Sequence, residues 1–148
     1  MKVEIRPQDF DPYQEVSAYQ REILQAEGKY GATAVFVGTM RDFNEGDDVA
    51  AMQLEHYPGM TEKYLAGIAE EAMQRWSLLD MVIVHRVGAV QPNETIVLVA
   101  VWSAHRADAF EACRHLMELL KSQAPFWKKE TLSSGAMRWV EKNTPGST

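Results

Sequence analysis

Two apolar, β-branched segments separated by a short polar turn constrain the fold more than any other feature of the sequence. Residues 81–90 read MVIVHRVGAV, residues 95–103 read TIVLVAVWS, and QPNE lies between them. Runs of this length, bounded by turn residues, are typical of buried strands. A membrane-spanning helix needs about 20 apolar residues, which no run here reaches. The sequence therefore predicts a β-hairpin in the protein interior.

Three segments have the apolar spacing of helices. The first begins at Asp11-Pro12, an N-cap followed by proline at the first helical position, and is expected to end near Ala26, before Gly28. The other two cover residues 60–76 and 107–123, and Pro125 ends the last one. Further strands are predicted at residues 31–38, 51–57, 127–132 and 137–141.

The middle of the chain thus has the order β-α-β-β-α-β, which is that of a split βαβ unit, with one more helix and strand in front. We expect an α+β fold, in which helices pack on a mixed, mostly antiparallel sheet. The sequence contains no interdomain linker, so we expect a single domain over residues 1–148, with residues 143–148 as a flexible tail.

The charges are unevenly distributed along the chain. The net charge is −6, and residues 1–80 carry 7 basic and 15 acidic groups, whereas residues 81–148 carry 8 basic and 6 acidic groups. This balance argues against general nucleic-acid binding but leaves room for a local anion site in the second half. The single cysteine, Cys113, excludes an internal disulfide and a cysteine-based zinc site, and it fits a cytoplasmic protein.

Several common catalytic patterns are missing from the sequence. The glycines match neither a dinucleotide fingerprint nor a P-loop, and no Gly-x-Ser-x-Gly motif is present. The four histidines lack the spacing of metal ligands. We therefore expect no metal site, and no serine or cysteine nucleophile.

Basic residues at the ends of predicted elements are the remaining candidates for a site. Arg41 follows a buried strand, and His105-Arg106 stands where a strand ends and a helix begins. Such positions often bind anions, although each residue is equally explained as a surface charge or a local cap.

The segment 121–130, KSQAPFWKKE, carries the densest basic signal. Lys121 lies near a helix C-terminus, where the helix dipole alone favours a cation. The dipole does not explain Lys128 and Lys129, which lie beyond Pro125 beside two aromatic residues. Desolvation by such neighbours lowers the pKa of a lysine, which can then act as a base or nucleophile. The segment predicts a functional anion pocket, with a solvated surface as the alternative.

These residues resemble a known family, the large subunit of molybdopterin synthase. The resemblance rests on segments 36–46, 54–57, 85–88, 103–106 and 121–130, on Met60 and Glu94, on Ala109-Phe110 and on Trp139-Val140. They follow the family's order over nearly the whole chain. The pattern Lys-x-x-x-Pro-x-Trp-Lys-x-Glu in segment 121–130 is the most specific of them.

The resemblance implies a fold and an activity. The fold is the α/β hammerhead. The activity, in molybdenum cofactor biosynthesis, is transfer of sulfur to a cyclic pyranopterin monophosphate, which forms the dithiolene of molybdopterin. The donor is the C-terminal thiocarboxylate of a small ubiquitin-like subunit, and no cofactor is required. The implied assembly is a heterotetramer with two large subunits at its centre.

The resemblance also assigns roles to individual residues. Lys121 would polarise the thiocarboxylate of the partner, and Lys128 would assist either proton transfer or the opening of the ring and phosphate. Glu130 would orient Lys128 or contact the substrate. The pterin and its phosphate would be bound by a set comprising Thr39, Met40, Arg41, His105, Arg106, Lys121, Lys128, Lys129 and Glu130. Lys129 is the one member of this set that is alternatively interpreted as a solvated surface lysine without a role in binding.

Two other functions remain compatible with the sequence. A non-catalytic module could bind the C-terminal carboxylate of a ubiquitin-like protein in the same basic pocket. A regulatory dimer that binds a pterin or a nucleotide would not need Lys121 and Lys128 so close together.

Overall fold

A four-stranded sheet forms the centre of the computed structural model, which describes residues 1–140. Its order is β1-β5-β7-β2, comprising β1 (Lys2–Arg6), β5 (Leu78–Arg86), β7 (Thr95–Ser103) and β2 (Ala32–Thr39). β1 pairs in parallel with β5, and the other pairs are antiparallel. All nine residues of β7 are buried, because this strand is covered on both faces of the sheet. The predicted hairpin is therefore the interior of the protein.

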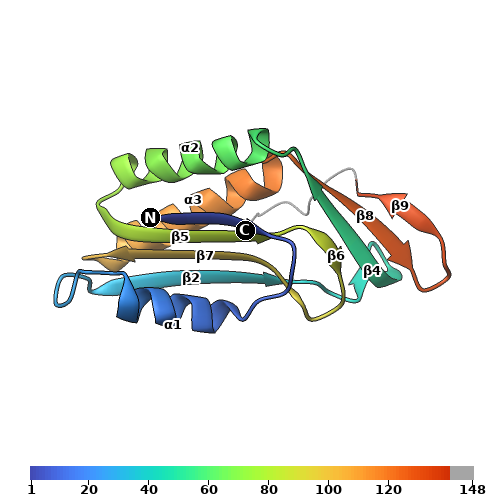
Figure 1. The fold of residues 1–148 in the computed structure, drawn as a ribbon, viewed down its shortest axis with the longest axis horizontal. Coiled ribbons are helices and arrows are strands. Elements are labelled where there is room, and N and C mark those ends of the chain that lie inside the picture. The colour runs from blue at the N-terminus through green and yellow to red at the C-terminus, as the bar shows by residue number, and fades with distance from the viewer. Residues whose placement is uncertain (141–148) are drawn as a thin grey trace.

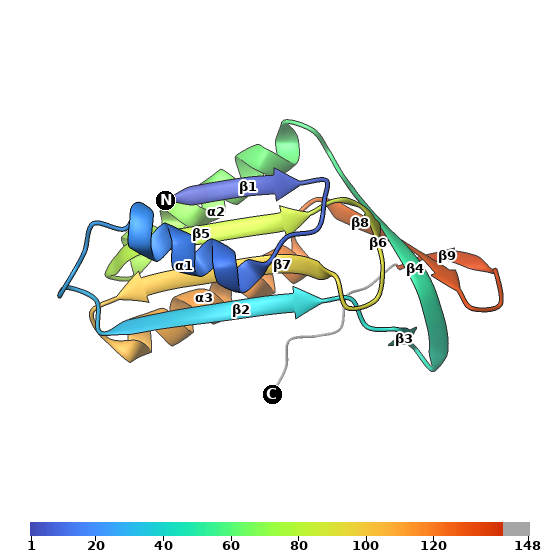
Figure 2. The ribbon, with the colours of Figure 1, turned by 60° about the horizontal axis from the view of Figure 1, so that its bottom comes forward.

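Three helices cover this sheet (Figures 1 and 2). α2 (Met60–Arg75) and α3 (Arg106–Ser122) pack on one face, and α1 (Pro12–Glu22) packs on the other. The alternation of strand side chains divides the core accordingly. Ile83 and Val99 face α2 and α3, whereas Val84 and Leu98 face α1.

A second sheet extends from one end of the first (Figure 1). It contains β3 (Phe43–Asn44), β4 (Asp47–His56), β8 (Phe126–Leu132) and β9 (Met137–Trp139) in that order, and β6 (Gly88–Val90) also pairs with β4. Every pair in it is antiparallel. The predicted α+β class with a mixed, mostly antiparallel sheet is confirmed. The predicted order β-α-β-β-α-β is found as β4, α2, β5, β7, α3 and β8, with the short β6 added after β5. Unlike the strands of a split βαβ unit, β4 and β8 pair with each other outside the first sheet.

Several boundaries differ from the sequence prediction, among them the starts of β4 at Asp47 and of β5 at Leu78. Segment 81–90 is two strands, because the chain turns between Arg86 and Gly88, where Gly88 has a φ of 90°. The first helix ends at Glu22 rather than near Ala26. The strand β9 ends at Trp139, and the expected flexible tail at 143–148 lies outside the described residues.

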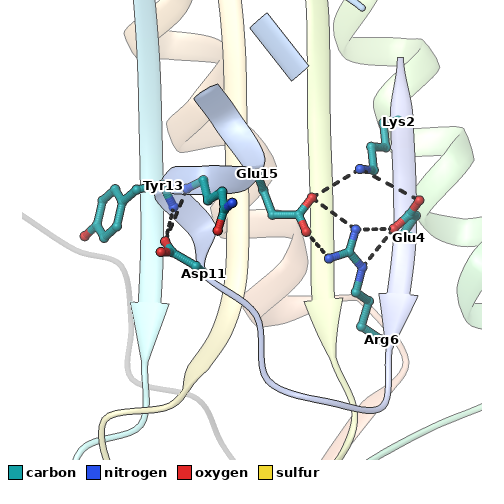
Figure 3. Close-up of polar contacts among 7 residues, drawn as sticks. Lys2, Glu4, Arg6, Asp11, Tyr13 and Glu15 are labelled. Carbon is teal, nitrogen blue, oxygen red and sulfur yellow. Dashed lines mark hydrogen bonds and ion pairs between the residues drawn. The ribbon is translucent and has the colours of Figure 1, made fainter. Parts of the chain in front are cut away.

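The sequence prediction missed β1, whose residues alternate between charged and apolar. Lys2 and Arg6 form ion pairs with Glu15 of α1, and both also reach Glu4 (Figure 3). The charged side chains thus join the strand to the helix above it. Asp11 caps α1 as expected, since its carboxylate accepts hydrogen bonds from the backbone N–H groups of Tyr13 and Gln14. Within residues 1–140, no helix is both long enough and apolar enough to cross a membrane.

Candidate active site

The first of two neighbouring cavities lies where the two sheets meet. It has a volume of about 120 Å³. Its walls come from the end of β2, the β3–β4 hairpin, the last turn of α3, and β8. Among its lining residues are Thr39, Met40, Arg41, Asn44, Lys121, Lys128 and Glu130. Six residues of the predicted binding set thus converge here from distant parts of the chain.

The second cavity lies on the other side of the two lysines and has a volume of about 220 Å³. It shares Lys121, Lys128, Ile96 and Val140 with the first cavity. Its other lining residues include the apolar side chains of Phe126, Trp127, Met117 and Leu120, together with His85. The two lysines therefore stand in the wall between the first cavity, which we call the polar cavity, and the second.

The two lysines are partly shielded from water by the elements that carry them. Lys121 belongs to the last turn of α3, and Lys128 lies on β8 opposite Leu54 of β4. Burial lowers the pKa of Lys121, and the charge of Arg41 acts in the same direction. Burial and the charge of Lys121 lower the pKa of Lys128 to about 8. Lys128 can therefore exist as a free amine close to neutral pH.

Glu130 is the buried carboxylate of the first cavity and is only 3 % exposed. The side-chain amide of Asn44 donates to both of its oxygens, at 3.2 and 3.1 Å, and Nε of Arg138 donates to one of them at 3.0 Å. Its negative charge raises the pKa of Lys128 and so partly offsets the effect of burial. The carboxylate is thus bound by neighbours on two other strands.

His85 is a neutral part of the second cavity. Its ring stacks on Phe126 with centroids 3.8 Å apart, and its Nδ1 lies 2.8 Å from the carbonyl oxygen of Arg86. Burial lowers the pKa of His85 to about 3, so the ring carries no charge and Nδ1–H donates to that carbonyl. Both His85 and the neighbouring Arg86 are almost fully buried, 6 % and 5 % exposed.

The residues that follow β2 form the outer rim of the first cavity. The backbone of Met40 is fixed by hydrogen bonds with Glu94 and Asn93 of the β6–β7 turn. The next residue, Arg41, is exposed, and its guanidinium lies 4.9 Å from the ring centroid of Phe43. An exposed guanidinium above a polar cavity can bind an incoming anion.

Three residues of the predicted set do not line either cavity. His105 and Arg106 are exposed at the N-terminus of α3. Lys121 is at the other end of this helix, about 22 Å away at 1.5 Å per residue. Lys129 points to the opposite face of β8 from Lys128, with its amine 5.5 Å from the ring centroid of Trp139. A single chain therefore does not bring these three side chains into the site.

Four residues of this site were not among the predicted site residues: Asn44, His85, Phe126 and Arg138. Asn44 and Arg138 belong to hairpins that meet only in the folded protein, so no spacing in the sequence reveals them. Phe126 and His85 lie 41 positions apart and stack because β8 crosses the end of β5. Within residues 1–140, no group of three or more His, Cys, Asp and Glu side chains is arranged to hold a metal ion.

Comparison with known proteins identifies the family. A family model described as MoaE protein matches residues 6–123. The molybdopterin synthase catalytic subunit of Ralstonia nicotianae is 51 % identical over 139 residues, which cover 94 % of this chain and 76 % of the relative. The subunit of the same name from Pseudomonas aeruginosa is 50 % identical over 141 residues, covering 95 % and 91 %.

Solved structures agree with this comparison. The molybdopterin biosynthesis MoaE protein of Burkholderia ambifaria superimposes with a TM-score of 0.77 at 50 % identity, covering 98 % of this chain and 92 % of the other. Molybdopterin synthase from Staphylococcus aureus gives a TM-score of 0.79 at 33 % identity, covering 93 % and 95 %. With a family model matching most of the residues and relatives of about half-identical sequence, the chain belongs to the MoaE protein family.

Proposed function

We propose that the chain is the catalytic subunit of a molybdopterin synthase, a sulfurtransferase of molybdenum cofactor biosynthesis. It takes sulfur from the C-terminal thiocarboxylate of a small ubiquitin-like subunit and transfers it to cyclic pyranopterin monophosphate. The observation that carries this proposal is the position of Lys121 and Lys128, which both border the two adjoining cavities. One cavity can receive the substrate while the other receives the tail of the sulfur donor.

The polar cavity suits a phosphorylated substrate. Arg41, Lys121 and Lys128 supply three cationic groups, whereas Glu130 is the single carboxylate among the lining residues that fall within 1–140. Arginine is suited to bidentate contact with phosphate, and Arg41 stands at the exposed rim where a phosphate would enter.

The two lysines divide the chemistry between them. Lys121 keeps its proton and donates hydrogen bonds to the carbonyl oxygen of the thiocarboxylate, which stabilises the negative charge that develops there. Lys128, with a pKa of about 8, accepts and returns a proton at the pterin. The negative charge of Glu130 offsets part of the positive charge that Lys121 and Arg41 place near Lys128. The reaction as proposed needs no metal and no organic cofactor.

We infer that His105 and Arg106 reach the site from a second copy of the chain. β2 is an edge strand of its sheet, and its side chains Val35 and Phe36 are exposed. Gly31, which precedes β2, is hydrogen-bonded to Ser103, close to His105, whereas Arg41 follows the other end of the strand. Antiparallel pairing of β2 with its copy would bring His105 and Arg106 of one chain toward Arg41 of the other.

This arrangement gives a central homodimer. Each large subunit then binds one small subunit, which makes a heterotetramer. Among the solved relatives, a complex of subunits 1 and 2 of molybdopterin-converting factor from Helicobacter pylori shares the fold, at 20 % identity and a TM-score of 0.78. We place the reaction in the cytoplasm, where the free thiol of Cys113 remains reduced.

Reconstitution tests the proposed function directly. The purified protein is mixed with a thiocarboxylated small subunit and cyclic pyranopterin monophosphate, and the dithiolene product is measured. Product formation is expected, and its absence would contradict the assignment. Binding of the pterin substrate alone distinguishes the enzyme from a module that only docks a ubiquitin-like protein, since such a module should not bind it.

A further inference from the structure

Arg138 connects three strands at the edge of the polar cavity without lining it. Its Nε donates to Glu130 of β8 at 3.0 Å, and its two terminal nitrogens donate to Asp47 and to the backbone carbonyl of Asn44, each at 2.9 Å. Glu45, in the β3–β4 turn, lies 3.7 Å from the same guanidinium. One side chain on β9 therefore joins β8 to the β3–β4 hairpin.

Asn44 completes this connection from the hairpin side. The side-chain amide of Asn44 donates to both oxygens of Glu130, while its backbone carbonyl accepts a hydrogen bond from Arg138. We call Asn44, Glu130 and Arg138 the hairpin clamp. Glu130 and Asn44 line the cavity, and Arg138 stands behind them with about a quarter of its side chain exposed. The clamp adds side-chain contacts to the backbone pairing of β4 with β8, and it ties the short strand β3 to β8 as well.

The turn at the tip of this hairpin needs such support. Glu45 and Gly46 both have positive φ, 52° and 82°, which gives a tight turn between two short paired segments. β3 contains only two residues, so its own pairing with β4 provides little stability. Arg41 and Phe43 immediately precede this turn, and the geometry of the cavity rim therefore depends on what holds the hairpin in place.

The clamp also controls the charge beside Lys128. Within residues 1–140, the groups that face Lys128 include Lys121 from α3, Arg41 from the segment after β2, Glu130 from its own strand, and the neutral His85 from β5. Only Glu130 among them favours the charged form of Lys128. Arg138 and Asn44 use the hydrogen-bonding capacity of Glu130 in contacts that do not involve the lysine.

We propose that Arg138 is a positioning residue, which holds the Glu130 carboxylate in the clamp and thereby prevents it from forming a close ion pair with Lys128. The proposal rests on the role proposed above for Lys128. A carboxylate released from the clamp would turn toward the nearest buried cation, and a lysine in such a pair keeps its proton. Arg138 thus keeps Lys128 available for proton transfer.

A titration of the lysines in the free protein tests this proposal without any substrate. The protein is labelled at lysine Cε with ¹³C, the Lys128 signal is assigned by its loss in Lys128→Arg, and the pKa is followed by NMR in four proteins. These are wild type, Arg138→Met, Glu130→Gln, and the double variant. Arg138→Met is expected to raise the pKa of Lys128 by about one unit, which means about tenfold less free amine at neutral pH.

The double variant shows whether Arg138 acts on the pKa of Lys128 through Glu130 or independently of it. If Arg138 acts through Glu130, its removal shifts the pKa much less in the Glu130→Gln background than in wild type. Equal shifts in both backgrounds, or no shift in either, would overturn the proposal. Arg21→Met, which removes an exposed arginine of α1, serves as the control and should leave the Lys128 signal unchanged.

The pH dependence of turnover provides a second test of the proposal. It differs from the test of the proposed function, which asks only whether the product forms. With a wild type that makes product, Arg138→Met should shift the pH–rate profile to higher pH, so that much of the lost rate returns on the alkaline side. A purely structural role would lower the rate by the same factor at every pH. That second pattern, like an unshifted lysine signal, would contradict the positioning role, whereas an inactive wild type would contradict only the function.

Discussion

Lys121 and Lys128 share a hydrogen bond in the wall between the two cavities, which both residues border. Burial is the largest effect on each and lowers both pKa values. The hydrogen bond between them favours the charged form of Lys121 and the neutral form of Lys128, so Lys121 donates and Lys128 accepts. This asymmetry gives one lysine the properties of an electrophilic donor and the other those of a base.

The first prediction concerns removal of each amine. Lys121→Ala is expected to lower turnover by about 10²–10³, as for loss of one donor to a developing oxyanion. Lys128→Ala is expected to lower it by about 10²–10⁴, the usual contribution of a general acid–base group. Steady-state assays measure both effects, and thermal melts check that the variants stay folded. Lys63→Ala, at an exposed position on α2, is the control and should behave like wild type.

The second prediction is that Lys128→Met stabilises the protein while it abolishes activity. The depressed pKa means that protonated Lys128 destabilises the folded state, fully below pH 8 and progressively less as pH rises toward 10.5. At neutral pH, protonated Lys128 lowers the free energy of unfolding by at most about 3 kcal/mol. Chemical denaturation at pH 7 should show a more stable variant.

The pH dependence provides the check on this second prediction. Wild type should gain stability relative to Lys128→Met between pH 8 and pH 10.5, because the folded state releases the proton of Lys128 before the unfolded state does. A stability difference that stays constant over this range would show that the lysine is not desolvated.

The sequence identified the central hairpin and the helices because their signals are local. Strand periodicity and the Asp11-Pro12 cap depend on neighbours within a few residues, and the expected helices at 60–76 and 107–123 were confirmed within one or two residues. β1 was missed because its charged residues are stabilised by Glu15, a partner that no local pattern reveals.

The site residues, too, could be predicted from the sequence only where their signals are local. Lys121 and Lys128 were found because they belong to one short segment, and Arg41 because it follows a buried strand. Arg138 and Asn44 were not found, because their common partner is Glu130 and the contacts with Asn44 span 86 positions of sequence. His105 and Arg106 illustrate the opposite case, since the predicted residues lie far from the cavities in the folded chain.

The third prediction concerns the ion pairs between β1 and α1. The guanidinium of Arg6 lowers the pKa of Glu15, and Lys2 adds to this effect. Glu15→Gln should therefore destabilise the protein at pH 7 by about 0.5–1 kcal/mol, because the pairs are partly exposed to solvent. Urea denaturation measures the difference. It should shrink as pH falls below 4.5, through the lowered pKa of Glu15, since the wild-type carboxylate then becomes protonated.

The fourth prediction tests whether two chains share each site. Arg41→Ala and Arg106→Ala should each lower turnover strongly as pure homodimers. Co-expression of the two variants should restore activity, because one site of every mixed dimer then contains neither substitution. With random pairing, the recovered activity should approach about a quarter of the wild-type value.

The interface itself can be tested at β2. Val35→Lys places a charge among the exposed apolar side chains of this edge strand and should shift the protein from dimer to monomer in light scattering. The monomer should keep its fold, because Val35 is 41 % exposed, but it should lose activity together with the second chain. Full activity in a monomeric Val35→Lys variant, or no recovery in the mixed dimers, would mean that His105 and Arg106 serve no neighbouring site. In that case Arg41 and the two lysines would have to bind the phosphate unaided.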